Sequence, residues 1–274
     1  MPELPEVETT KEGIKNHLLG QYIQAVIVRN SKLRIPVLAD INELCSAKQI
    51  VLITRRAKYI ILHLSQGYII IHLGMAGHLR VLPNTTSANK HDHIDLVLSN
   101  NLVLRFCDPR RFGLFHYLDG NPNESTLLAH LGPEPLSKDF NAEYLYKKAQ
   151  LKNLPIKSFI MNNEIVVGVG NIYATESLFL TGIHPNTITK TISYPLLAQL
   201  TGQIKQTLEM AIKSGGTTLR DFYSFDGKPG YFTISLQVYG RRKQPCFQCN
   251  NTIESIIIGG RHSAFCPQCQ PLSS

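Results

Sequence analysis

The chain has 274 residues, of which 43% are hydrophobic, and a formal net charge of +8. This length suits two domains and the composition predicts a soluble globular protein, since no apolar run approaches the roughly 20 residues of a membrane span. The positive charge favours a polyanionic partner such as a nucleic acid, although ribosomal and heparin-binding proteins share it. The N-terminus lacks the basic and apolar segments of an export signal, so a cytoplasmic location is predicted.

The first eight residues, M-P-E-L-P-E-V-E, place a proline directly after the initiator methionine. Removal of that methionine would leave Pro2 as a secondary amine, only partly protonated near neutral pH and able to form an iminium adduct with an electrophilic carbon. Of the nearby Glu3 and Glu6, one carboxylate can transfer a proton while the other holds the amine. The same residues also suit a helix start, with Pro5 at the first helical position and acidic residues in the first turn. From the chemistry alone, both interpretations stay open.

The next segment changes from a helical to a strand pattern. Apolar residues at positions 4, 7, 14 and 18 share one helical face, and Gly20 suits a C-terminal cap. Short β-branched or leucine-rich runs separated by turns then predict strands. They cover residues 22–28, 50–54, 59–64, 68–73, 78–82, 94–98 and 102–106. Regular short strands with tight turns predict an antiparallel sandwich or barrel.

Two predicted loops interrupt the strands. Residues 55–59, R-R-A-K-Y, carry three cations before an apolar strand, which is typical of a solvated strand end or a phosphate contact. In residues 72–77, H-L-G-M-A-G, glycines flank Met75. A methionine there could fill a core gap, but a tight turn would present it as an apolar wedge of the kind that enters a base stack.

Two further segments carry polar clusters. Residues 90–93, K-H-D-H, contain metal-ligand side chains, but Asp92 and His93 are predicted to open a strand and no second ligand cluster follows nearby. We therefore predict no metal site there. Residues 107–113, C-D-P-R-R-F-G, form a turn at Asp-Pro. By itself this segment predicts a basic β-turn with Phe112 in the core.

The second half of the chain is predicted to be mainly helical. Residues 131–136 carry two prolines and a glycine and indicate a linker, followed by helices at 139–152 and 155–161. Lys152 and Lys157 are interpreted as surface lysines. Two glycines before Asn171 let backbone N–H groups approach an anion at a helix N-terminus, and no βαβ unit supports dinucleotide binding. A longer structural helix follows and ends at glycines 215–216.

Four of the six cysteines lie in one C-terminal segment, as two C-x-x-C pairs sixteen residues apart. This spacing is a strong signal of one zinc ion bound by Cys246, Cys249, Cys266 and Cys269. Four thiolates complete the coordination sphere, so the zinc is predicted to be structural. A hairpin is predicted between the pairs, and its tip can present Arg261 to a phosphate. From the spacing alone, an exposed arginine without a partner stays an open alternative. Cys45 and Cys107 are interpreted as ordinary buried thiols.

The N-terminal octet, the 107–113 turn, the 168–179 stretch G-V-G-N-I-Y-A-T-E-S-L-F and the cysteine pairs resemble the bacterial formamidopyrimidine-DNA glycosylase/endonuclease VIII family over almost the whole chain. The resemblance implies an α+β fold. Its N-terminal antiparallel β-sandwich domain carries an N-terminal helix, and its C-terminal helical domain carries a helix-two-turn-helix element and a β-hairpin zinc finger. The implied bounds are 1–131 for the sandwich, 132–136 for a linker, 137–235 for the helical domain and 236–270 for the zinc finger.

The resemblance also implies an activity: base-excision repair of oxidised purines by a DNA glycosylase with AP lyase activity. Pro2 would form the Schiff base, Glu3 would transfer protons with Glu6 in support, and β,δ-elimination would follow. By the same resemblance, Lys58 transfers a proton during strand cleavage and Arg261 acts in the final elimination. DNA contacts are implied for Met75, His91, Arg110, Phe112, Lys152 and Asn171. A loop at 217–231 would close over the extruded base.

Two alternatives remain open at this stage. An endonuclease VIII-like enzyme would favour oxidised pyrimidines, but Leu4 and the 108–113 loop favour the purine enzyme. A non-catalytic zinc-ribbon protein would bind nucleic acid without needing Pro2, Glu3 or Lys58. The expected partner is double-stranded DNA with oxidised purines or abasic sites, bound by a monomer that associates with the nucleoid through DNA.

Overall fold

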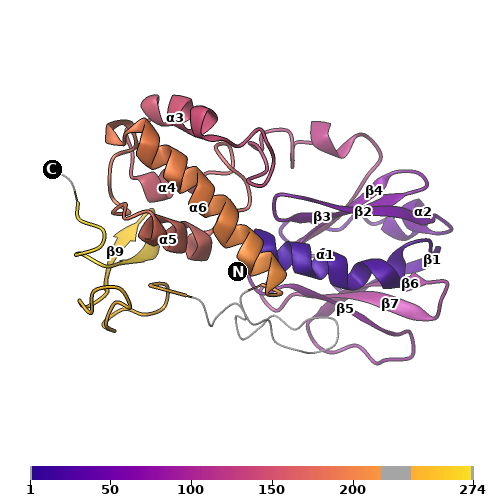
Figure 1. Cartoon of the computed structure of the whole chain (residues 1–274). Coiled ribbons are helices and arrows are strands. Elements are labelled where there is room, and N and C mark those ends of the chain that lie inside the picture. The colour runs from indigo at the N-terminus through magenta and orange to yellow at the C-terminus, as the bar shows by residue number, and fades with distance from the viewer. Residues whose placement is uncertain (1, 217–235, 273–274) are drawn as a thin grey trace. The chain divides into compact units, whose positions relative to one another are not determined.

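The computed structural model describes residues 2–216 and 236–272 (Figure 1). These residues fall into two compact units, one containing residues 2–129 with 215–216 and the other containing 130–214 with 236–272. The predicted loop at 217–231 lies outside the described residues. Within the described part of the chain, no helix is both long and apolar enough to cross a membrane.

The first unit is an antiparallel β-sandwich with an N-terminal helix, α1 (Leu4–Leu18). One sheet has the order β1-β6-β7-β5 and the other the order β2-β3-β4-β8. The strands are β1 (Ile23–Val28), β2 (Ile50–Arg56), β3 (Tyr59–Leu64), β4 (Tyr68–His72), β5 (His78–Pro83), β6 (Asp92–Leu98), β7 (Leu102–Cys107) and β8 (Leu114–Leu118). The predicted sandwich is confirmed.

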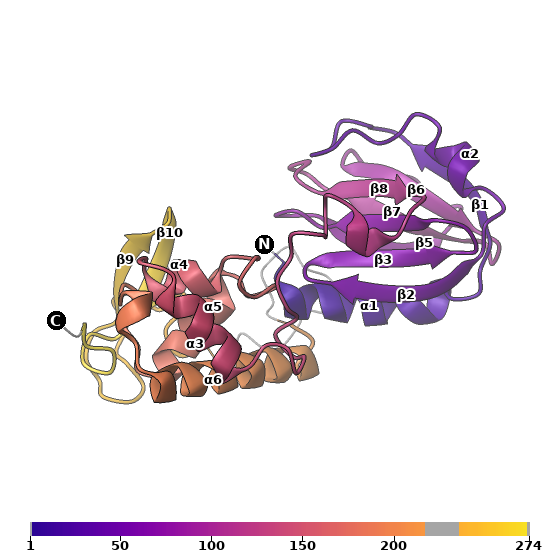
Figure 2. The same cartoon turned by 90° about the horizontal axis from the view of Figure 1, so that it is seen from above.

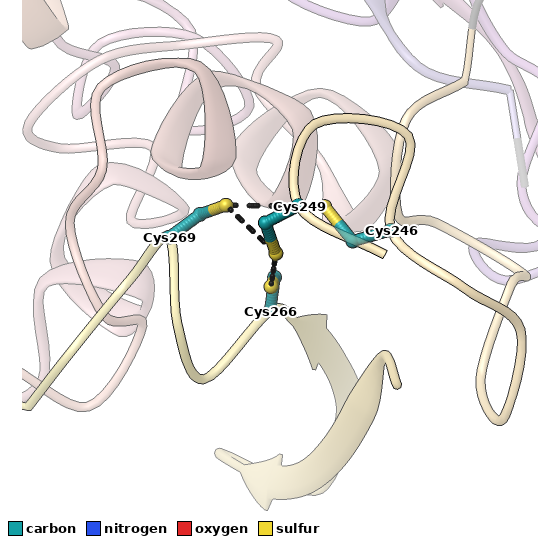
Figure 3. Close-up of side chains that lie close together, drawn as sticks. All are labelled: Cys246, Cys249, Cys266 and Cys269. Carbon is teal, nitrogen blue, oxygen red and sulfur yellow. Dashed lines mark hydrogen bonds between the residues drawn. The ribbon is translucent and has the colours of Figure 1, made fainter. Parts of the chain in front are cut away.

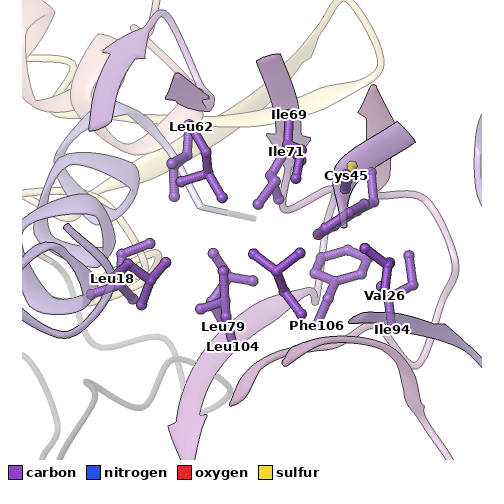
Figure 4. Close-up of a cluster of buried hydrophobic side chains, with 14 of the residues drawn as sticks. Leu18, Val26, Cys45, Leu62, Ile69, Ile71, Leu79, Ile94, Leu104 and Phe106 are labelled. Carbon is purple, nitrogen blue, oxygen red and sulfur yellow. The ribbon is translucent and has the colours of Figure 1, made fainter. Parts of the chain in front are cut away.

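The sandwich core forms where the inner faces of the two sheets meet. Leu62 and Ile71 come from one sheet, and Leu79, Leu104 and Phe106 come from the other (Figure 4). All five are at most 3% exposed. Burying each such side chain contributes about 1.5–3 kcal/mol, so this face specifies the strand register.

Two helices cover the edges of the sandwich. Helix α1 contacts β2 and β5, which are edge strands of the two sheets (Figure 1). Helix α2 (Ile41–Cys45) contacts β1 and β8, the edge strands at the opposite side. This arrangement protects edges that would otherwise offer unpaired backbone groups. It also fixes the N-terminus of α1 on the folded sandwich.

Helix α2 and strand β8 of this unit were not predicted from the sequence, and the bounds of one loop were misplaced. Helix α2 has five residues, too few for a helical period to be visible. Strand β8 follows the 107–113 turn and completes the second sheet by pairing with β4. The predicted loop at 55–59 was wrong at its first two residues, because Arg55 and Arg56 end β2, whereas Tyr59 opens β3 as predicted.

The second unit combines helices with a C-terminal hairpin (Figure 2). Its helices are α3 (Ala142–Gln150), α4 (Ile156–Ile160), α5 (Asn171–Leu180) and α6 (Tyr194–Lys213), and its strands are β9 (Glu254–Ile258) and β10 (Arg261–Phe265). Helix α6 packs on α3 and α5, and α5 also contacts β10. The predicted helices and hairpin are confirmed, and with the sandwich they confirm the α+β fold class.

Both remaining cysteines are buried as predicted. Cys45 is 0% exposed and Cys107 is 8% exposed. Burial raises the pKa of the Cys45 thiol to about 12. Burial, together with nearby Asp92, raises the pKa of Cys107 to about 11. Both side chains therefore stay protonated and unreactive at neutral pH.

Candidate functional site

The N-terminal end of α1 holds three predicted site residues. Pro2 is buried, Glu3 is the N-cap and Glu6 lies one turn later; Glu3 and Glu6 are 2% and 1% exposed. The Glu3 N–H donates to Glu6 Oε2 at 2.8 Å, and the Glu3 carboxylate accepts from the Glu6 N–H. This reciprocal capping box confirms the helix start. It does not compete with a chemical role, because the same hydrogen bonds fix both carboxylates at the end of the helix that follows Pro2.

Lys58 lies in the turn between β2 and β3, and Arg55 ties this turn to α1. Arg55 Nε donates to Glu8 Oε2 at 2.7 Å, and its Nη1 donates to the Ala57 carbonyl at 2.8 Å. Ala57 has a φ of 53°, the left-handed conformation that such a tight turn requires. Although burial opposes ionisation of Glu8, its pKa is lowered by Lys11 and Arg55, so the ion pair persists. Lys58 therefore stands on a turn that Arg55 fixes to α1.

The Met75 loop and the Arg110–Phe112 loop lie against each other. Met75 is 41% exposed and Phe112 is 47% exposed, so neither fills the core. A Cβ at Gly74, which has a φ of 64°, would lie 2.5 Å from the Gly113 nitrogen and 2.6 Å from the Phe112 carbonyl carbon. Only glycine permits this approach. The interpretation of Phe112 as a core residue was therefore wrong, and two exposed apolar side chains stand on adjoining turns.

Asp108 organises the second of these loops. Its Oδ1 accepts from the Arg110 N–H at 3.2 Å and its Oδ2 accepts from the Gly113 N–H at 2.7 Å. The Asp108 N–H donates to the His91 carbonyl at 3.0 Å, and the Asp108 carbonyl pairs with His93 Nε2 at 2.8 Å. Asp108 is fully buried. One carboxylate and its backbone thus present Arg110 and hold the His91 segment beside it.

Asp92, which follows His91, also makes hydrogen bonds within this unit. Asp92 pairs with Arg80 and accepts the Asn89 N–H at 2.7 Å.

Arg110 itself lies over the Phe112 ring, with its guanidinium carbon 4.9 Å from the ring centroid. A cation and an aromatic ring therefore occupy the same exposed turn, which suits contacts with phosphates and bases.

His72, at the end of β4, holds the first residues of the Met75 loop in place. Its Nδ1 accepts the Gly74 N–H at 3.0 Å, and its ring packs on Tyr59 with centroids 4.8 Å apart. Burial, with the charges of Lys58 and Arg34, lowers the pKa of His72 to about 4. The ring is therefore neutral in the folded protein at neutral pH, as an acceptor at Nδ1 must be.

We expect His72 to make the first unit sensitive to mild acid. A folded pKa below the unfolded value of about 6.5 means that its contribution is complete above pH 6.5 and is lost as the pH falls toward 4. Between pH 7 and pH 5 the loss is at most about 2 kcal/mol of unfolding free energy. Urea titrations followed by circular dichroism at both pH values would measure it.

The His72→Gln variant isolates this effect. Burial also lowers the pKa of His63, His78 and His116, so the wild-type loss is a sum over several residues. The difference in unfolding free energy between wild type and His72→Gln should therefore shrink from pH 7 to pH 5. A difference that does not change with pH would contradict a low His72 pKa.

In the second unit, Lys157 joins Asn171 to the C-terminal hairpin. Lys157 Nζ donates to Asn171 Oδ1 at 2.6 Å, to Ser263 Oγ at 2.7 Å and to the His262 carbonyl at 3.1 Å. Lys157 is 1% exposed, so its interpretation as a surface lysine was wrong. Nothing in its local pattern signalled this role, because two of its partners lie more than 100 positions away along the chain.

The contact orients the Asn171 side chain. Its oxygen faces an ammonium group, so its NH₂ group remains to donate elsewhere. Asn171 begins α5 directly after the N-cap Gly170, where backbone N–H groups and the helix dipole favour an anion. Lys152 is exposed, as predicted, and Arg261 is exposed at the start of β10. A two-glycine turn, with φ values of 55° and 71°, precedes Arg261.

The four C-terminal cysteines converge as the spacing predicts (Figure 3). Their sulfur atoms all lie within 4.8 Å of one another, with 3.4 Å between Cys249 and Cys266 and 3.9 Å between Cys246 and Cys269. A tetrahedral Zn²⁺ with bonds of about 2.3 Å needs sulfur atoms about 3.8 Å apart. The donor set and its dimensions therefore fit zinc. Within the described residues, no other group of three or more potential ligands has such an arrangement.

Comparisons with known proteins agree with this organisation. Family models match for the formamidopyrimidine-DNA glycosylase N-terminal domain at residues 1–115, the formamidopyrimidine-DNA glycosylase H2TH domain at 131–223 and the zinc finger found in FPG and IleRS at 243–272. A formamidopyrimidine-DNA glycosylase from Legionella pneumophila strain Philadelphia 1 is 64% identical over 272 residues, covering 99% of both chains.

Two solved structures extend the comparison to DNA complexes. Lactococcus lactis Fpg, bound to DNA with an abasic site, has a TM-score of 0.92 and 31% identity, covering 98% of this chain and 99% of that one. A MutM protein bound to DNA with carbocyclic 8-oxo-G has a TM-score of 0.91 and 30% identity, covering 98% of this chain and all of that one. The matches confirm the resemblance noted in the sequence and span both units, and the chain belongs to the formamidopyrimidine-DNA glycosylase family.

Proposed function

We propose that the protein is a bifunctional DNA glycosylase and AP lyase that removes 8-oxoguanine and formamidopyrimidines from duplex DNA. The observation that carries this proposal is Pro2, buried at the start of α1 beside the capping box of Glu3 and Glu6. A binding module would need no such arrangement. Family membership and the damaged-DNA complexes of similar proteins support the substrate class.

The chemistry begins at the Pro2 amine once Met1 has been removed. Its lone pair attacks the anomeric sugar carbon, the glycosidic bond breaks and the base leaves with a proton. Glu3 transfers protons at the sugar, while Glu6, which accepts the Glu3 N–H, keeps this end of the helix in place. The amine then loses its proton, its lone pair breaks the bond between the anomeric carbon and the ring oxygen, and Glu3 protonates that oxygen, so the opened sugar becomes an iminium adduct.

Strand cleavage follows from the acidity of the carbon next to the iminium group. Loss of its proton expels the 3′ phosphate, and a second elimination expels the 5′ phosphate, leaving a one-nucleotide gap flanked by phosphates. We assign proton transfer in these steps to Lys58 and a role in the last elimination to Arg261. Hydrolysis of the final iminium group breaks its bond to the sugar fragment, which leaves as an unsaturated aldehyde and restores the Pro2 amine.

Lesion access uses the adjoining exposed turns. Met75 and Phe112 wedge into the base stack, and Arg110 hydrogen-bonds the base left without a partner. Phosphate contacts fall to His91, Lys152 and Asn171, whose free NH₂ group and helix N-terminus suit an anion. The net charge of +8 favours this partner.

The remaining features follow from this function. One Zn²⁺ held by the four cysteines would be structural, because four thiolates leave no open coordination position. We propose that the protein acts as a monomer associated with the nucleoid through DNA. The proposed domains are the sandwich at 1–131, a linker at 132–136, the helix-two-turn-helix domain at 137–235 and the zinc finger at 236–270.

Borohydride trapping tests the proposal directly. Protein with Met1 removed would be incubated with a duplex carrying one 8-oxoguanine opposite cytosine, beside protein with a blocked N-terminus and a Pro2→Gly variant. Borohydride reduces the iminium adduct to a stable amine, so the wild type should become covalently joined to DNA. The blocked protein should give no adduct, and Pro2→Gly, which offers a primary amine, should measure the advantage of proline.

Substrate controls separate the alternatives. A duplex with an oxidised pyrimidine should be processed more slowly than the 8-oxoguanine duplex; the reverse order would favour an endonuclease VIII-like enzyme. Tight binding of damaged DNA with no adduct and no strand cleavage would refute the enzyme and support a zinc-ribbon binding protein.

A further inference from the structure

Glu176 on α5 is a buried carboxylate without an assigned role. It is 2% exposed, and three consecutive backbone N–H groups converge on it. Gln237 donates to Oε2 at 2.7 Å, and Val238 and Tyr239 donate to Oε1 at 3.0 and 2.7 Å. Burial raises the pKa of Glu176, while these N–H groups and Arg241 act in the opposite direction. Removing this carboxylate would take away the acceptor of the buried Val238 N–H, and a buried donor that loses its acceptor is costly.

The segment held by Glu176 leads into the zinc finger. Val238 is fully buried in one apolar cluster with Phe179 of α5 and with two zinc-ligand cysteines, Cys246 and Cys266. Arg241 continues the connection, because its guanidinium donates to the carbonyls of Gln237 and Pro245 and lies over the Phe247 ring. The three bonds to Glu176 therefore dock the entrance of the zinc finger on α5.

A second buried charge holds the other side of the same zinc finger. Lys157 donates to the carbonyl of His262 and the hydroxyl of Ser263, the two residues after Arg261, and also to Asn171 at the start of α5. Glu176 lies on the same helix as Asn171, five positions further along. The helices therefore bind the zinc finger at two places: Lys157 of α4 binds β10, and Glu176 of α5 binds residues 237–239.

We propose that Glu176 is a positioning residue for the lyase reaction, because it docks the zinc finger on α5 and so sets where Arg261 lies relative to Asn171. The inference rests on the proposed function, in which Arg261 acts in the second elimination and Asn171 binds a phosphate. Glu176 itself touches neither DNA nor the reacting atoms in this assignment.

The Glu176→Gln variant tests this role. Glutamine preserves the size of the side chain but places an NH₂ group among N–H donors, so at least one hydrogen bond is lost. We expect bound zinc to remain at one ion per chain and hydrogen exchange of the 237–239 amides to rise about tenfold or more. The KM for 8-oxoguanine DNA should rise more than kcat falls, and the β-elimination product should accumulate over the β,δ product. The KM and the product ratio of Glu176→Asp should lie between those of the wild type and those of Glu176→Gln.

Two further variants serve as the negative and the positive control for Glu176→Gln. Glu143→Gln removes an exposed carboxylate from α3 and should behave as wild type. Arg261→Ala should give the same product shift as Glu176→Gln. A wild-type product ratio and KM in Glu176→Gln would overturn the proposal. So would loss of zinc from both Glu176 variants, because Glu176 would then be required for folding of the finger. If the wild type itself formed no trapped adduct, the proposed function would fail, whereas the exchange data would still report on docking.

Discussion

The Glu3→Gln variant is expected to lose base excision almost completely while keeping its fold. Glutamine retains an oxygen that can accept the Glu6 N–H, so the capping box at the start of α1 is largely preserved. It cannot take up or release a proton, and a lost general acid or base costs about 10²–10⁴-fold in rate. Single-turnover cleavage of an 8-oxoguanine duplex would measure this loss.

A second substrate shows which step has failed. A preformed abasic site has no glycosidic bond to break, so the Pro2 amine can attack its aldehyde without departure of a base. Glu3→Gln should therefore still be trapped by borohydride on abasic DNA, even where it fails on 8-oxoguanine. Equal losses on both substrates would show instead that Glu3 holds Pro2 in place.

The matched control is Glu12→Gln on the same helix. Its side chain is 52% exposed and lies away from the N-cap, so activity should not change. Glu6→Gln tests the supporting role: it retains an oxygen that can accept the Glu3 N–H and removes a buried charge. Its excision rate should fall less than that of Glu3→Gln, because Glu6 is assigned to hold the helix end.

Local sequence patterns predicted those elements and sites that are determined by residues close together in the chain. The helix at residues 4–18 follows from apolar spacing, and the zinc site follows from two C-x-x-C pairs, because ligand spacing within a hairpin determines which sulfur atoms can meet. The exposed Met75 was also foreseen, since flanking glycines permit a turn that keeps it out of the core.

The features that escaped prediction depend on distant partners. Lys157 is indistinguishable from a surface lysine until β10 folds beside it, and Glu176 meets its donors 61 to 63 positions away. Phe112 was interpreted as a core residue because its own segment does not show that its loop packs against Gly74, which belongs to another turn. Such roles are created by tertiary contacts and leave no periodic signal in the chain.

Removal of the bound metal is expected to abolish DNA processing while leaving the β-sandwich folded. Coordination by four thiolates contributes about 10–16 kcal/mol in zinc-finger peptides, far more than a small hairpin can supply from its own core. The apolar cluster around Cys246 and Cys266 should therefore disperse, and the hairpin that carries Arg261 should lose its position. The sandwich core lies wholly in the other unit, so its β-sheet circular dichroism should persist.

The experiment combines chelation with a single-ligand variant. Zinc would be stripped with a strong chelator, and Cys249→Ser would remove one thiolate; both should lower affinity for 8-oxoguanine DNA by more than about tenfold, or 1.4 kcal/mol. Cys45→Ala is the matched control, because it removes a buried thiol from the sandwich and should keep one zinc per chain. Restoring zinc should recover the chelated wild type but not Cys249→Ser. If zinc-free protein cleaved damaged DNA at the normal rate, the finger would have no part in the reaction, and the role assigned to Arg261 would fall with it.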